Sequence, residues 1–105
     1  MPKYGGGPAY VFYGLVATGI TATINNSATP IGEDDVSIPY TGIAGGAEFH
    51  KNDVDPRNGV YVIKIGDEYM LVTNDASTTL TVKRKIMDAA AQHADGSTIT
   101  EYRFF

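Results

Sequence analysis

Two apolar runs in the second half of the chain lie on either side of a two-residue turn signal. Val60–Ile65 and Tyr69–Val72 are rich in β-branched and aromatic side chains, and Gly66-Asp67 separates them. Strand-forming runs around a short glycine-containing turn are a strong signal of a β-hairpin. A third strand is expected at Thr78–Val82, where threonines alternate with apolar residues. The pattern predicts a three-stranded meander, and the residues expected in its core are Leu71, Leu80 and Val82.

Outside the meander, other β-prone runs predict more strands. Their ranges are Ala9–Ala17, Thr18–Ile24, Val36–Tyr40 and Thr98–Phe104. Because Pro39 has no N–H to donate, Val36–Tyr40 is expected at a sheet edge. We therefore expect an all-β fold, built as a small antiparallel sheet, a sandwich or a barrel.

One short helix and one terminal arm complete this prediction. Residues 88–94 combine an N-capping Asp88 with three alanines, and Gly96 follows, which favours a helix of at most about two turns. Residues 1–8 hold three successive glycines between two prolines, which is typical of a flexible arm. The remaining residues, 9–105, are expected to form a single β domain, since the chain has 105 residues.

Composition narrows the classes of function. The net charge is −4 and the longest basic run is Lys83-Arg84-Lys85, so we expect no nucleic-acid partner. No apolar run approaches the length of a membrane span, so we expect no membrane partner. The chain has no cysteine, which excludes disulfides and thiolate metal sites. A core of this size leaves little surplus stability, which favours a homo-oligomer.

Residues 68–99 carry a series of short motifs: E-Y-M-L-V, then T-L-T-V-K-R, then A-A-A-Q-H-A-D-G-S-T-I. In this order they resemble a β-module of tailed-bacteriophage structural proteins, which reads E-x-M-x-V, T-L-T-V-x-R-G, a Gly-Thr pair and A-A-A-H-x-x-G-x-x-V. The matching residues are Glu68, Met70, Val72, Leu80, Val82, Arg84, Ala89, Ala90, Ala91, His93, Gly96 and Ile99. The chain departs from the module in two places, because Lys85 replaces a glycine of the module and Asp88-Ala89 replaces the Gly-Thr pair.

The resemblance implies a non-enzymatic virion component, assembled in the cytoplasm of a bacterial host. Its structural motif residues here are Glu68, Arg84, His93 and Gly96. A small capsid decoration (cement) protein is the role most like this chain, with the major capsid protein or other virion subunits as partners and a homotrimer as the favoured oligomer. A tail, baseplate or head–tail connector component built from the same module is the alternative. A carbohydrate- or receptor-binding module is a further alternative.

Candidate chemistry is sparse. His93 with Asp88 or Asp95 could ligate a metal, but a structural histidine that ties its loop to the sheet is the favoured interpretation. A cation at His50, with Asp53 and Asp55, would lack enough oxygen ligands for calcium. We therefore expect no metal, no cofactor and no catalytic residue.

Glu68 begins a predicted strand, and Lys83-Arg84 ends the neighbouring one. A four-residue turn between these strands would bring their ends together, so the sequence predicts a cross-strand ion pair. If exposed, such a pair contributes little stability.

Aromatic residues gather towards both ends of the chain. They are Tyr4, Tyr10, Phe12, Tyr13, Tyr102, Phe104 and Phe105. They either complete the domain's own core or contact another chain, since tyrosine suits a surface that is part buried and part wet. These seven residues are the predicted partner interface.

Overall fold

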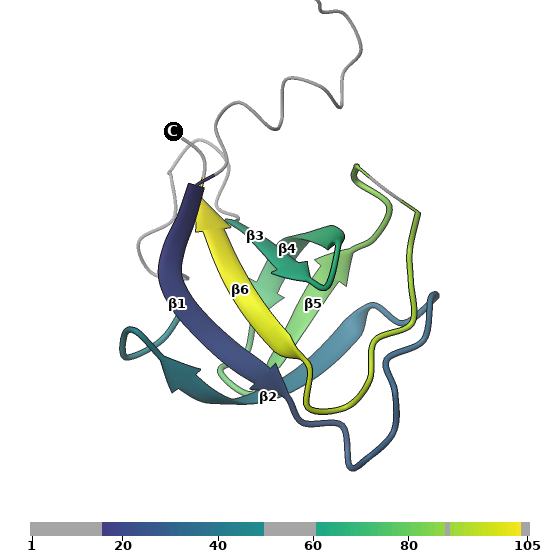
Figure 1. Cartoon of the computed structure of the whole chain (residues 1–105), viewed down its shortest axis with the longest axis horizontal. Helices are drawn as coiled ribbons and strands as arrows, with labels where there is room; N and C mark the ends of the chain where they lie inside the picture. Colours follow the sequence, from purple (N-terminus) through teal and green to yellow (C-terminus); the bar gives the residue numbers. More distant parts are fainter. Residues whose placement is uncertain (1–15, 50–60, 88, 104–105) are drawn as a thin grey trace, which may run out of the picture.

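The structure is a computed structural model that describes residues 16–49, 61–87 and 89–103. These residues form six strands, and each strand pairs in antiparallel fashion with its neighbours. The strands are β1 (Val16–Ile24), β2 (Ser37–Ala44), β3 (Tyr61–Ile65), β4 (Glu68–Asp75), β5 (Thr79–Lys83) and β6 (Thr98–Arg103). The sheet closes on itself in the order β1-β2-β5-β4-β3-β6, so that β6 lies between β1 and β3 (Figure 1). The all-β prediction is confirmed.

The predicted meander is present as β3, β4 and β5. Ile65 pairs with Glu68 across the two-residue turn, and Gly66 has a φ of 59°. A glycine with positive φ at the first central position is the usual requirement of a type II′ hairpin turn. The two-residue turn sets the register of this hairpin.

The barrel interior is filled mainly by isoleucine. Its buried members are Ile20, Ala22, Ile24, Ile31, Ile38, Tyr40, Phe49, Ile63, Ile65, Met70, Val72, Leu80, Val82 and Ile99, with Ile43 packed against them. Leu80 and Val82 lie in this core as expected, but Leu71 is only half-buried. The expectation for Leu71 was wrong because Met70 and Val72 are the residues of β4 that point inward, which leaves Leu71 on the outer face.

Two other expectations differ from the structure. β2 extends to Ala44 and lies between β1 and β5, so it is not an edge strand. The missing N–H of Pro39 is tolerated because Pro39 faces Asn25, one residue beyond the end of β1, and only accepts a hydrogen bond there. Residues 89–94 form no helix. Their backbone groups are used elsewhere: Ala91 and His93 bond to groups outside the segment.

Two long connections lie together beside the barrel (Figure 1). Residues 25–36 join β1 to β2, and residues 84–97 join β5 to β6. The Ile31 N–H donates to the His93 carbonyl at 2.7 Å, and the His93 N–H donates to the Ile31 carbonyl at 2.9 Å. The Asp95 carboxylate also accepts from the N–H groups of Asn26 and Ala28, at 2.6 and 3.0 Å. The two connections therefore form one layer.

Candidate functional site: a buried glutamate–arginine–histidine network

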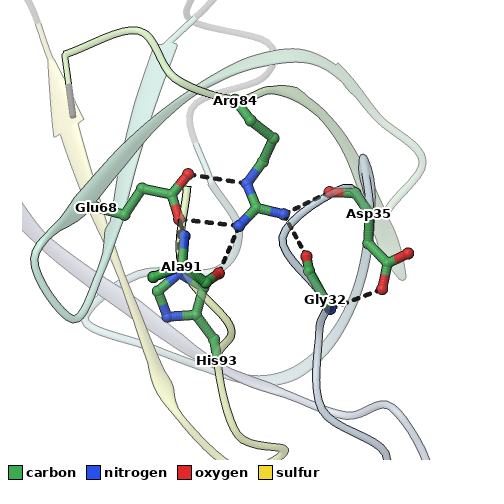
Figure 2. Close-up of polar contacts among 6 residues, drawn as sticks. All are labelled: Gly32, Asp35, Glu68, Arg84, Ala91 and His93. Atoms are coloured by element: carbon green, nitrogen blue, oxygen red, sulfur yellow. Dashed lines mark hydrogen bonds and ion pairs between the residues drawn. The ribbon is translucent and has the colours of Figure 1, made fainter. Parts of the chain in front are cut away.

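Three ionisable side chains meet where the two long connections cover the barrel (Figure 2). Glu68 is the first residue of β4, Arg84 directly follows β5, and His93 lies in the β5–β6 connection. All three residues are buried. Glu68 and Arg84 have the same inward parity as Met70 and Val82, so the strands direct both side chains inward at one end of the barrel.

Arg84 uses all five of its N–H donors. Nε and Nη2 donate to the two carboxylate oxygens of Glu68, at 2.8 and 2.9 Å. Nη1 donates to the carbonyls of Gly32 and Asp35, at 2.7 and 2.6 Å, and Nη2 also donates to the Ala91 carbonyl at 2.7 Å. One guanidinium therefore holds the β1–β2 connection, the β5–β6 connection and β4 together (Figure 2).

Both carboxylate oxygens of Glu68 likewise have hydrogen-bond donors. Besides its two hydrogen bonds from Arg84, Oε1 accepts from the Ala91 N–H at 3.0 Å and from His93 Nε2 at 2.8 Å. A carboxylate can only accept, so His93 must carry its hydrogen on Nε2. Within the described residues, no buried side-chain nitrogen or oxygen lacks a hydrogen-bond partner. A buried polar network of this kind fixes geometry because each group would be costly to leave unpaired.

The surroundings lower the pKa of Glu68. Burial by itself would raise it, because the charged form is desolvated. Hydrogen bonds from Arg84, Ala91 and His93, together with the positive charge of Arg84, outweigh burial and bring the pKa to about 2. The carboxylate therefore stays ionised in mildly acidic solution.

The cross-strand ion pair predicted from the sequence is present, and it is buried rather than exposed. The side chains of Glu68 and Arg84 are 1% and 5% exposed. Gly96 lies outside the network and turns the chain into β6, with a φ of 87° and an N–H that donates to the Ile24 carbonyl at 3.0 Å. Gly66 lies beneath His93, since a Cβ there would be 3.7 Å from the imidazole ring.

Of the predicted partner-interface residues, the structure describes Tyr102. Its ring packs edge-on against Tyr69, with centroids 5.4 Å apart and planes at 78°. Lys64 Nζ lies 5.3 Å from the centre of the Tyr69 ring. The other six lie outside the described residues: Tyr4, Tyr10, Phe12, Tyr13, Phe104 and Phe105. His50, Asp53 and Asp55 also lie outside them, and in the described ranges no group of three histidine or acidic side chains is arranged to hold a metal ion.

Sequence reasoning missed two partly buried hydrogen bonds between distant residues. Glu101 is fully buried, and the Thr18 hydroxyl donates to its Oε1 at 2.8 Å. The sequence does carry a signal for Glu101, because it lies two residues after the apolar Ile99. Residues two apart in a strand face the same side of the sheet, so both point inward. The Tyr40 hydroxyl donates to Asp75 Oδ1 at 2.8 Å, and burial and this hydrogen bond raise the tyrosine pKa.

Comparison with protein-family models, curated proteins and solved structures found no match to the chain. The resemblance of residues 68–99 to the phage β-module therefore stays a prediction. No helix in the described part of the chain has the length and hydropathy to cross a membrane.

Proposed function

We propose that the chain is a non-enzymatic structural component of a tailed-phage particle, and that it serves as a capsid decoration protein. The supporting observation is that the motif residues form one connected unit. Glu68, Arg84, Ala91 and His93 are joined by hydrogen bonds. The apolar motif residues Met70, Val72, Leu80, Val82 and Ile99 pack in the barrel core beside them.

This connectivity gives the resemblance a physical basis. The motif spacing places a carboxylate at the start of one strand and a guanidinium at the end of the next, and both bind the backbone of the segment that follows. Lys85 has a φ of 62°, so the position where the module has glycine adopts the left-handed conformation that glycine favours.

A rigid barrel suits a protein that clamps a shell. Loops that are fixed before binding lose little conformational entropy on association, so more of the contact energy appears as affinity. The network fixes both long connections to the barrel, which leaves them preorganised as contact surfaces. The major capsid protein is the proposed partner. A tail, baseplate or connector role rests on the same observation and is the alternative.

The deciding experiment is a copy count in purified particles made from the genome that encodes the chain. Quantitative mass spectrometry would compare the chain with the major capsid protein. Decoration predicts hundreds of copies, and loss of the gene should lower the temperature at which particles release DNA. A tail or connector part predicts a few to tens of copies. Absence of the chain from purified particles would overturn both roles.

A further inference from the structure

Two solvent-exposed lysines flank the buried Arg84. Lys83 ends β5, and Lys85 is the first residue after Arg84. Across the residues that the structure describes, no ion pair engages either ammonium group. The chain as a whole is acidic, with a net charge of −4. This surface is therefore a local concentration of unpaired positive charge.

The backbone at Lys85 is held in a conformation that a side chain disfavours. Its φ of 62° lies in the left-handed region, where glycine has no steric penalty. The residue before Lys85 is Arg84, whose side chain is held by five hydrogen bonds, so the lysine follows a fixed point of the chain. Strained residues at fixed positions are often kept for contacts that the isolated domain does not use.

An exposed acidic loop adjoins these lysines. Glu33, Asp34 and Asp35 are all exposed. Arg84 Nη1 binds the carbonyls of Gly32 and Asp35, at the two ends of this loop, so the loop is fixed to the side chain of the residue that separates the two lysines. Unpaired charges of opposite sign therefore lie next to each other on one side of the barrel.

Val36 follows the acidic loop and is 50% exposed. Its carbonyl accepts from the Val82 N–H at 2.9 Å, one residue before Lys83. Val36 thus lies opposite Val82, one residue along the paired strands from both the acidic loop and Lys83.

We propose that this surface, made of Glu33, Asp34, Val36, Lys83 and Lys85, joins two copies of the chain about a two-fold axis. In a two-fold contact, if residue i of one copy meets residue j of the other, then j also meets i. Adjacent patches of opposite sign satisfy this rule, because the lysines of each copy face the acidic loop of its partner. The axis would also bring together the two Val36 side chains.

The proposed contact involves none of the terminal aromatic residues, and it favours a dimer over the trimer expected from the resemblance. It goes beyond the proposed function, because it concerns the isolated chain and does not require a phage particle.

Charge reversal with complementation tests the proposal. The variants are Lys85→Glu and the double change Glu33→Lys with Asp34→Lys, studied by sedimentation equilibrium of the full chain. The wild type should form dimers that weaken as salt is raised. Each variant alone should dissociate at least about 10-fold more readily, because like charges then meet twice at the axis. An equimolar mixture should recover dimers, since both contacts of the mixed pair are again of opposite sign.

Lys64→Glu is the matched control, because β3 lies opposite β2 in the closed barrel and is separated from β5 by β4. It should leave the dimer unchanged. Lys85→Gly separates folding from association: it should raise the melting temperature of the domain while weakening the dimer. A wild-type chain that stays monomeric at the highest concentration reached would overturn the proposal. So would variants that dimerise normally, or a mixture that fails to recover dimers.

Discussion

The Glu68 carboxylate and the Arg84 guanidinium meet side by side, with each carboxylate oxygen accepting one hydrogen bond from the guanidinium, at 2.8 and 2.9 Å. This paired geometry is the strongest form of an arginine–carboxylate contact. Removing one partner of a buried ion pair leaves the other charge without compensation, and that loss dominates the energetic effect of a substitution.

Glu68→Gln should therefore lower the free energy of unfolding by about 3–5 kcal/mol. The amide keeps the size of the side chain but leaves the guanidinium charge unpaired and turns one acceptor into a donor. Urea denaturation measures the change. Asp67→Asn is the matched control, because Asp67 is exposed in the adjoining turn, and it should change stability by less than about 0.5 kcal/mol. Equal stability of the two variants would contradict the central role of this pair.

The low pKa of Glu68 predicts how stability depends on pH. The pKa of the glutamate is about 4.5 in the unfolded chain and about 2 in the folded one, so the folded state binds the proton less readily. The resulting stabilisation is complete above pH 4.5 and disappears as the pH falls towards 2. It corresponds to roughly 3 kcal/mol. Urea titrations across this range should show the loss in the wild type. In Glu68→Gln, this part of the pH dependence should be absent.

Lys85→Gly should raise stability by about 1 kcal/mol, because glycine adopts a φ of 62° without a clash. Lys83→Gly is the control on the other side of Arg84. Lys83 lies within β5, where glycine should lower stability by about 0.5–1 kcal/mol. Thermal melting of both variants shows whether each substitution raises or lowers the stability of the domain. A lower melting temperature for Lys85→Gly would mean that the lysine side chain itself stabilises the domain.

Gly45 and Gly96 both have positive φ, 81° and 87°, yet alanine should affect them differently. A Cβ at Gly45 would overlap the carbonyl oxygen of Gly19 in β1, whereas a Cβ at Gly96 would meet no atom within 4 Å. Gly96→Ala should therefore cost only the backbone strain, about 1–2 kcal/mol. Gly45→Ala should cost clearly more, or fail to give folded protein. Similar melting temperatures would show that β1 and β2 can move apart at this point.

The sequence predicted the parts of the fold that depend on neighbouring residues. The turn at Gly66-Asp67 is local, so the hairpin followed from it. Leu71 was misplaced because Tyr69–Val72 is apolar at every position, and such a run has no alternation to distinguish its two faces. The helix at 88–94 was wrong because alanine propensity is a weak preference. Hydrogen bonds from Ala91 to Glu68 and Arg84 outweigh that preference.

The contacts of the candidate site also divide into local ones, which the sequence predicted, and long-range ones, which it did not. The ion pair was predictable because Glu68 begins β4, Arg84 follows β5, and one short turn joins these two strands. The two residues are therefore only 16 positions apart in the sequence. The contacts of Arg84 with Gly32 and Asp35 span 52 and 49 residues. They bind to backbone carbonyls, which every residue has, so no side-chain pattern marks them in the sequence.

The position of β6 between β1 and β3 has a consequence for the order of folding. Thr18 and Glu101, which meet where β1 pairs with β6, are 83 residues apart. Closing so long a loop costs entropy before its contacts form, so the hairpins of β3, β4 and β5 should form first and closure should come late. Until β6 docks, the edges of β1 and β3 that it pairs with are both open, and a single strand then covers both. Until synthesis reaches β6, the chain therefore exposes two strand edges with unpaired backbone N–H and C=O groups. Incomplete chains are then at risk of pairing with one another through these edges.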